Sequence, residues 1–121
     1  MKPDYHFFNN TFYALNGIKT LWQNEKSFRL EILIVFPFFI LSFILPFPFL
    51  NQIFLCFVLF LVLLTEAINS AIEYTVDLNT TEFHILAKKA KDCASAAVFF
   101  SICNASFCWI VHLIYFCLNF N

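Results

Sequence analysis

The stretch Glu66-Ala-Ile-Asn-Ser-Ala-Ile-Glu73 follows the apolar run Ile53–Leu64, with a single threonine between them. If the apolar run spans a membrane, two carboxyl groups and an amide lie at or inside the edge of the bilayer. A charged residue near the centre of a membrane helix costs about 2.5–3.5 kcal/mol on insertion scales. Chains keep such residues where they do chemistry, conduct ions or pair with another group, so this stretch bears on both fold and function.

The composition is that of a membrane protein. The chain has 121 residues, of which 61% are hydrophobic and 12% are charged, whereas a water-soluble domain carries about 25% charged residues. The length allows one domain, taken as residues 1–121. We therefore expect an all-α membrane protein whose apolar surface faces lipid, and no nucleic-acid partner.

The seven lysines and arginines predict the orientation in the membrane. All of them precede the first apolar block or lie between the last two blocks, and positive residues in short loops stay in the cytoplasm. The pattern predicts three spans, with the N-terminus and the 77–92 loop cytoplasmic and the 51–52 turn and C-terminus outside. These residues are Lys2, Lys19, Lys26, Arg29, Lys88, Lys89 and Lys91.

Hydrophobic periodicity predicts an amphipathic helix, three membrane spans and a short connecting helix. Residues 4–24 form an amphipathic helix that suits the inner headgroup plane, although packing on the bundle would give the same pattern. The spans are expected at about 32–50, 53–76 and 93–118, which agree with the length needed to cross a bilayer. A short cytoplasmic helix over 82–92 leads into the third span.

Smaller features refine these segments. Pro37 is expected to kink the first span, and Pro46 and Pro48 to end its regular helix early. The loop at residues 77–82 holds Thr80 and Thr81, either of which could cap the following helix. Trp109 and Tyr115 are expected in the aromatic belt at the outer interface.

The five cysteines are interpreted as small buried hydrophobic residues, with Cys108 and His112 as an alternative metal pair.

Helical phase places the polar residues of the second span on one face. At about 100° per residue, the side chains of this polar stripe lie within about 60° of Glu66. The rise of about 1.5 Å per residue puts Glu66 about 10 Å inside the cytoplasmic boundary of a 30 Å hydrocarbon core, and Glu73 at that boundary. Glu66 is thus at the depth of a lipid hydroxyl and suits a general base, while Glu73 could hold a metal ion. The polar stripe consists of Glu66, Asn69, Ser70, Glu73 and Asp77.

Other charged groups lie at the same membrane level. Glu25 and Arg29 precede the first span at the i, i+4 spacing of a surface ion pair. Lysines at 88, 89 and 91 could meet phosphate groups, and Mg²⁺ takes one or two carboxylates plus substrate phosphates. Gly17 is the only glycine, so the glycine-rich phosphate loops of P-loop proteins and protein kinases are excluded.

Three readings of the polar stripe remain open from these patterns. The first is an enzyme site. The second is a non-enzymatic proton or cation path through an oligomer, since intramembrane acids also mark such paths. The third is a polar seam that holds helices together in an assembly.

Several short motifs resemble the prokaryotic diacylglycerol kinase family. They are Glu66-Ala-Ile-Asn-Ser-Ala-Ile-Glu73, Val76-Asp77, Ala90-Lys91-Asp92, Ser95-Ala-Ala-Val98, Trp22-Gln-Asn-Glu25, Phe28-Arg29 and Glu31. The resemblance implies a homotrimer of three-span protomers in the bacterial cytoplasmic (inner) membrane. It also implies transfer of the γ-phosphoryl group of MgATP to a lipid alcohol at the cytoplasmic face.

The resemblance also implies roles for individual residues. Glu66 looks like the general base, Glu25 and Glu73 like the Mg²⁺ ligands, and Asn69 and Asp77 like supporting groups. Residues similar to the ATP contacts of the family are Tyr13, Glu25, Glu73, Glu82, Phe83, His84, Lys91 and Asp92. Those similar to the lipid contacts are Trp22, Arg29, Glu66 and Ser95.

The chain departs from the family at two positions, and its substrate is open. His6 stands where the family often has arginine, and Phe83 where it often has tyrosine. The stretches Glu66-Ala-Ile-Asn-Ser70 and Thr81-Glu-Phe-His84 resemble the diacylglycerol branch. His84-Ile-Leu-Ala-Lys88 is closer to the undecaprenol branch. We expect diacylglycerol as substrate, with undecaprenol as the alternative.

Overall fold

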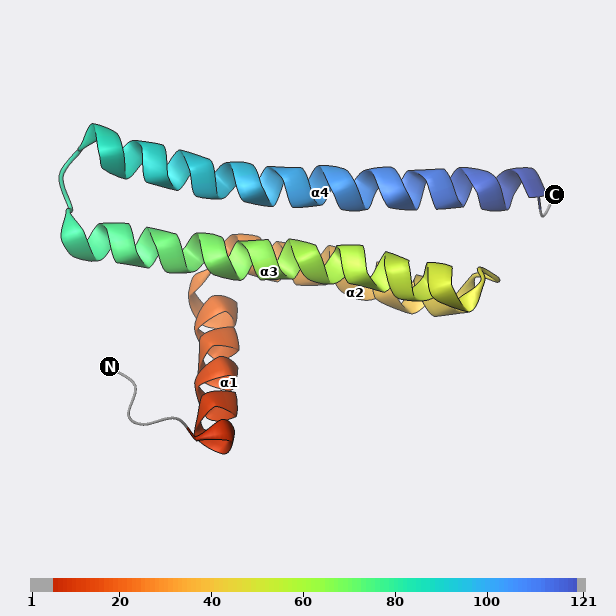
Figure 1. Ribbon diagram of the computed structural model, residues 1–121, viewed down its shortest axis with the longest axis horizontal. Helices are drawn as coiled ribbons and strands as arrows, with labels where there is room; N and C mark the ends of the chain where they lie inside the picture. Colours follow the sequence, from red (N-terminus) through yellow and green to blue (C-terminus); the bar gives the residue numbers. More distant parts are fainter. Residues whose placement is uncertain (1–5, 120–121) are drawn as a thin grey trace.

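Three long helices form a bundle, and a fourth runs across it (Figure 1). The computed structural model describes residues 6–119, which hold the helices α1 (Phe7–Asn24), α2 (Lys26–Ile44), α3 (Phe49–Asn79) and α4 (Ile85–Asn119) and no strand. α3 packs against both α2 and α4. α2, α3 and α4 are each long and apolar enough to cross a membrane. The predicted all-α membrane fold with three spans is confirmed.

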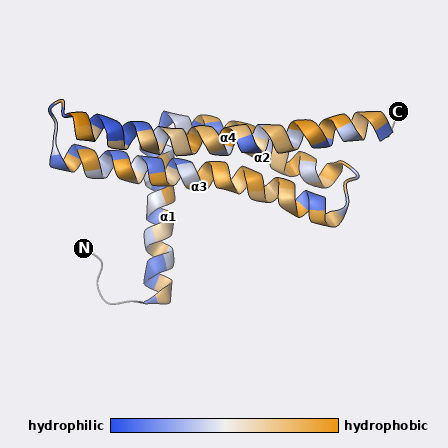
Figure 2. Cartoon of the chain, turned by 45° about the horizontal axis from the view of Figure 1, so that its top comes forward, coloured by the Kyte–Doolittle hydropathy of each residue, from blue (hydrophilic) through white to orange (hydrophobic). Residues whose placement is uncertain are grey.

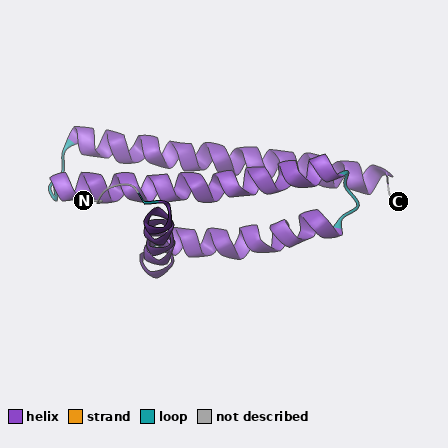
Figure 3. Ribbon diagram, turned by 60° about the horizontal axis from the view of Figure 1, so that its bottom comes forward, coloured by secondary structure: helices purple, strands orange, loops and turns teal. Residues whose placement is uncertain are grey.

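α1 leaves the bundle at a steep angle (Figure 1), is seen almost end-on in Figure 3, and makes little contact with the other helices. Leu21 is its only buried residue, whereas Phe8, Phe12 and Ile18 are exposed. An amphipathic helix with a free apolar side, lying across three spanning helices, suits a membrane surface better than a packed position on the bundle. The helix begins at Phe7, and positions 4 and 5 of the predicted segment lie outside the described residues.

The prolines mark the end of α2. The helix stops at Ile44, and Leu45 before Pro46 is extended (ψ 142°), because a residue that precedes proline avoids the helical region. Pro37 lies inside α2 without ending it. The early end is as predicted, but the bounds 32–50 are wrong, since α2 begins at Lys26 and ends six residues sooner.

The turn between the first two spans is not at residues 51–52 as predicted. It lies at 45–48, and α3 begins at Phe49 because Pro48 occupies the N-cap, where its missing N–H is not needed. Gln52 lies in the first turn of α3, donates its backbone N–H to the Pro48 carbonyl (3.0 Å) and its side-chain amide to the Leu45 carbonyl (3.4 Å). The Gln52 side chain thus supports the helix start.

His112 joins α3 to α4 at this end of the bundle. Its Nε2 lies 3.1 Å from the Asn51 amide nitrogen, and its Nδ1 lies 2.6 Å from the Cys108 carbonyl oxygen. Both ring nitrogens therefore have partners within the chain. The contact with Asn51 joins α3 to α4, whereas the Cys108–His112 spacing reflects a contact within α4, and the alternative of a metal pair is not supported.

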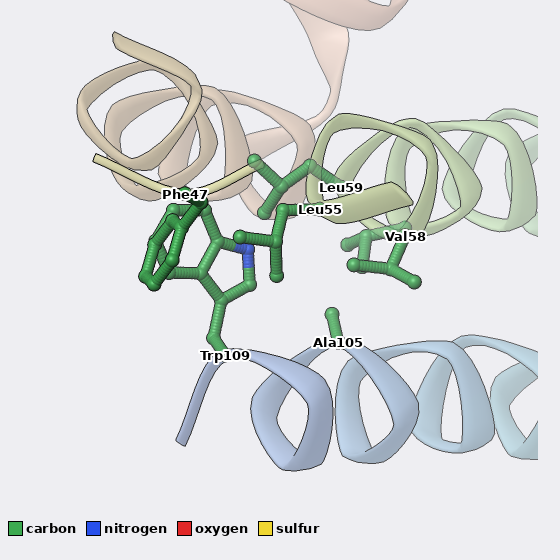
Figure 4. Close-up of a cluster of buried hydrophobic side chains, with 7 residues drawn as sticks. Phe47, Leu55, Val58, Leu59, Ala105 and Trp109 are labelled. Atoms are coloured by element: carbon green, nitrogen blue, oxygen red, sulfur yellow. The ribbon is translucent and has the colours of Figure 1, made fainter. Parts of the chain in front are cut away.

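A hydrophobic core fills the space between the three long helices (Figure 4). Trp109 is 4% exposed and packs edge-on against Phe38, with ring centroids 5.0 Å apart. The prediction that Trp109 belongs to an interfacial belt is therefore wrong, because its face of α4 turns inward, while Tyr115 is exposed. The core consists of Phe47, Leu55, Val58, Leu59, Val62, Ala105 and Trp109.

The cysteines differ from the prediction that all are buried. Cys56 is buried and Cys108 is half-buried, whereas Cys93, Cys103 and Cys117 are exposed, and all five are free thiols. The reason is geometric, because α4 packs along one face only and its outward side chains are left for lipid. Their apolar character fits this position as well as a core position.

The α3–α4 connection is shorter than predicted. α3 continues to Asn79, and Thr80 forms a local turn in which its hydroxyl accepts a hydrogen bond from the Glu82 N–H (3.3 Å). His84 caps α4, since its Nδ1 accepts the Leu86 N–H at 3.1 Å, so the threonine cap was the wrong prediction. α4 is one continuous helix, and hydrophilic residues gather at its start (Figure 2).

Candidate active site

The polar stripe on α3 has the predicted geometry. The Asn69 amide donates a 3.3 Å hydrogen bond to Glu73 Oε1, so these two residues share a face. Exposure rises along the stripe, from 3% at Glu66 through half-buried Glu73 to exposed Asp77. Asn69 and Ser70 are buried, and the Asn69 Oδ1 and Ser70 Oγ atoms have no hydrogen-bond partner within the described chain.

The depth of Glu66 changes with the true start of α3. The helix begins at Phe49 rather than Ile53, which moves Glu66 about 6 Å further from the outer end at 1.5 Å per residue. Measured from Phe49, Glu66 lies about 25 Å along the helix, close to the far boundary of a 30 Å hydrocarbon core. Glu66 is therefore nearer to the headgroup region than the sequence indicated.

Two residues of α2 hold the Glu66 side chain. Ser27 donates a 2.8 Å hydrogen bond from its hydroxyl to Glu66 Oε1, and the Glu31 carboxyl lies against that of Glu66. Ser27 and Glu31 are four residues apart and so share a face of α2. Ser27 is not among the residues predicted for the site, and Glu31 is named only in the resemblance. The i, i+4 spacing of two polar residues at the start of a span was the available signal.

Glu25 forms the elbow between α1 and α2. Its backbone is extended (φ −111°, ψ 105°), and its N–H still donates to the Leu21 carbonyl at the end of α1. Oε1 of Glu25 accepts a 2.6 Å hydrogen bond from the hydroxyl of Tyr74 on α3. The bond holds Glu25 next to the turn of α3 that carries Glu73, the residue before Tyr74.

Arg29 binds backbone rather than Glu25. Its Nη1 donates to the carbonyl oxygens of Trp22 (2.7 Å) and Gln23 (3.2 Å). These carbonyls end α1, where helices leave acceptors without partners and a positive charge is favourable. The predicted alternative of a Glu25–Arg29 ion pair is wrong. The two ion pairs within residues 6–119 join Lys88 to Asp92 and Lys91 to Asp77.

A charged cavity of about 300 Å³ lies at the α3–α4 connection. Lys91 Nζ is 2.6 Å from Asp77 Oδ1, which ties the end of the polar stripe to the start of α4. Lys88 and Asp92 form a second 2.6 Å pair on α4. The cavity brings together most of the residues expected to contact ATP, namely Glu82, Phe83, His84, Lys91 and Asp92.

The other predicted residues lie on α1 and α4 or directly before α1. Tyr13 is half-buried on α1, Trp22 is exposed near the end of α1, and Ser95 is exposed on α4 one turn after Lys91. His6 occupies the N-cap of α1 and makes no side-chain capping bond.

Among residues 6–119, three or more metal-ligating side chains do not gather at one place. The protein therefore builds no cage of its own for a cation within this range. Mg²⁺ does not require one, because it is held by one or two carboxylates together with substrate phosphates. Glu25 and Glu73 are two carboxylates of the kind this donor set requires: the Glu25 side chain is bonded to the Tyr74 hydroxyl, and Glu73 directly precedes Tyr74 in α3.

The fold and the site together define a class of protein. Three helices are long and apolar enough to cross a membrane, and one of them, α3, carries the buried Glu66 carboxyl group. A cavity with lysine and aspartate lies at the end of the same polar stripe. Such an arrangement fits an integral-membrane enzyme.

Comparison with known proteins identifies the family. The family described as prokaryotic diacylglycerol kinase matches residues 12–113. A diacylglycerol kinase of Helicobacter pylori strain J99 is 39% identical over 102 residues, covering 84% of this chain and 80% of the relative. Those of Haemophilus influenzae and Escherichia coli K12 are 36% and 35% identical, covering 86% and 84% of this chain and 88% and 83% of the relatives. The chain belongs to the prokaryotic diacylglycerol kinase family.

Membership in this family makes the chain a lipid kinase that uses ATP. It favours the enzyme over the non-enzymatic proton or cation path and over the purely structural seam.

Proposed function

We propose that this protein transfers the γ-phosphoryl group of ATP to the hydroxyl of diacylglycerol and so forms phosphatidic acid. The observation that carries the proposal is the polar stripe of α3, which runs from buried Glu66 to Asp77 beside the charged cavity. The lipid hydroxyl reaches the stripe at Glu66, and the nucleotide reaches it from water at Asp77.

Glu66 acts as the general base. It takes the proton of the lipid hydroxyl while the hydroxyl oxygen bonds to the γ-phosphorus, and the bond from that phosphorus to the β–γ bridging oxygen breaks to release ADP. Ser27 orients the Glu66 carboxyl through the 2.8 Å hydrogen bond. Asn69 and Asp77 support the site, Asn69 by its bond to Glu73 and Asp77 by its bond to Lys91.

The nucleotide binds in the cavity between α3 and α4. Lys91 and Asp92 lie beside it, and Lys91 can exchange its partner Asp77 for a phosphate oxygen. Tyr13, Glu82, Phe83 and His84 complete the ATP contacts. Glu25 and Glu73 would hold Mg²⁺, which when bound neutralises charge on the phosphates.

The lipid lies against the elbow side of the bundle. Trp22, Arg29 and Ser95 are proposed to contact it near Glu66. The charge pattern supports a cytoplasmic N-terminus, an outer C-terminus and chemistry on the cytoplasmic face of the bacterial inner membrane. We also propose a homotrimer, on the basis of the family.

Undecaprenol is the second candidate substrate. His84-Ile-Leu-Ala-Lys88 favours it, and it offers the same chemical group, a lipid hydroxyl near the headgroup level. Glu66-Ala-Ile-Asn-Ser70 favours diacylglycerol.

One assay tests the reaction and the substrate together. The purified protein in mixed micelles is given MgATP with diacylglycerol, with undecaprenol or with no lipid alcohol, and the phosphorylated lipid and ADP are quantified. We expect ADP release that depends on diacylglycerol. Preferential phosphorylation of undecaprenol would replace the proposed substrate, and ADP release without any lipid would contradict a lipid kinase.

A further inference from the structure

Tyr74 connects the α1–α2 elbow to α3 through one side-chain contact. Its hydroxyl donates a 2.6 Å hydrogen bond to Oε1 of Glu25, across 49 residues of sequence. We propose that Tyr74 is a positioning residue that holds the Glu25 carboxylate ready for a divalent cation. The inference rests on the proposed role of Glu25 and Glu73 as cation ligands.

The geometry leaves Glu25 free to bind a cation while Tyr74 holds it. A carboxylate has two oxygens and about four acceptor positions, and the phenol occupies a position on Oε1 only. Tyr74 directly follows Glu73 in α3, so the residue that holds one proposed ligand is the chain neighbour of the other. The hydrogen bond thus attaches the Glu25 carboxylate to the helix that carries Glu73.

The elbow needs such a contact because packing there is sparse. α1 runs away from the bundle (Figure 1), and a cavity of about 330 Å³ lies between it and α3, with Gly17, Ser70 and Tyr74 among its lining residues. Glu25 lies between two helices in an extended conformation. A glutamate at such a position has many rotamers to lose on binding a cation, and the bond to Tyr74 restricts them in advance.

Hydrogen bonds to metal-ligating carboxylates are typically worth a factor of 10–100 in metal affinity. The Tyr74→Phe substitution keeps the ring and removes only the hydroxyl. Tyr74 is 45% exposed, so water can reach Glu25 in the variant and no buried charge is left without a partner. We expect about a tenfold loss of cation affinity, with unchanged KM for the lipid and recovery of kcat at saturating Mg²⁺.

The test measures binding of Mn²⁺ to the full-length protein in detergent micelles, in the presence of a non-hydrolysable ATP analogue, by the electron paramagnetic resonance signal of free Mn²⁺. The variants are Tyr74→Phe, Glu25→Gln and the two combined, with Tyr115→Phe as control. Tyr115 is an exposed tyrosine on α4 far from Glu25 in the chain. We expect weaker Mn²⁺ binding in both single variants, no further loss in the combination and wild-type binding in the control.

Three results overturn the inference in distinguishable ways. Unchanged or tighter Mn²⁺ binding in Tyr74→Phe, with weaker binding in Glu25→Gln, rejects the role of Tyr74 and leaves the cation ligands in place. Equal losses from Tyr74→Phe with and without Glu25→Gln show that Tyr74 does not act through Glu25. Wild-type binding in Glu25→Gln rejects Glu25 as a ligand, which is a failure of the proposed function itself.

Discussion

The hydroxyl of Ser27 donates a 2.8 Å hydrogen bond to Oε1 of Glu66 and so joins the first turn of α2 to the buried end of the α3 polar stripe. Glu66 is 3% exposed, and the carboxyl group of Glu31 on α2 also lies next to it. A carboxyl group held from a second helix has a defined orientation, which general-base catalysis requires.

Removing this hydroxyl is expected to slow catalysis. A hydrogen bond of this kind contributes about 1 kcal/mol, so Ser27→Ala should lower kcat about fivefold with little change in KM for ATP. Steady-state kinetics in mixed micelles measures both constants. Ser106→Ala, at an exposed serine of α4, is the matched control. A kcat equal to wild type in Ser27→Ala would show that the hydrogen bond does not orient the base.

Lys91 is expected to act on the nucleotide. Its ammonium group pairs with Asp77 at 2.6 Å beside the charged cavity, and a charge-assisted bond to phosphate contributes about 1.5–3 kcal/mol. Lys91→Met should therefore raise KM for ATP at least tenfold while leaving KM for the lipid near its original value. Lys89→Met, at an exposed position of the same helix, controls for loss of charge at this level. A larger effect from Lys89 than from Lys91 would argue against the proposed ATP contact.

Trp109 is expected to stabilise the bundle rather than the membrane interface. Its ring is 4% exposed and packs on Phe38, and replacing a buried tryptophan with alanine costs about 3–5 kcal/mol. Trp109→Ala should lower the midpoint of thermal unfolding in detergent clearly, whereas Ile110→Ala at the adjacent exposed position should change it little. Equal shifts in the two variants would place Trp109 outside the core.

The elements that follow from local periodicity were predictable. Helical phase placed Glu66, Asn69 and Glu73 on one face, and the Asn69–Glu73 hydrogen bond confirms it for that pair. Hydropathy indicated three spans, and the two prolines at 46 and 48 indicated the end of α2.

Two predictions were wrong because they used the polarity or the depth of a residue and left out its position in the helix. The 51–52 turn was placed by its polar side chains, although Pro48 is the residue that starts α3 and Gln52 serves that start. Trp109 was placed by depth alone, although its face of α4 turns toward α3 and α2. The contacts of Ser27 and Tyr74 join helices across 39 and 49 residues. The spacing of Ser27 and Glu31 marks a polar face of α2, but a single sequence does not indicate which residue of a distant helix meets it.

The role of Glu66 as general base is the central claim, and the Glu66→Gln variant tests it most directly. The substitution keeps the shape and the ability to accept from Ser27 but removes the group that takes a proton. Phosphatidic acid formation from diacylglycerol and MgATP should fall at least a thousandfold, while oligomer size and binding of a non-hydrolysable ATP analogue stay as in wild type. Wild-type turnover by Glu66→Gln, or loss of the oligomer in place of loss of chemistry, would contradict the account.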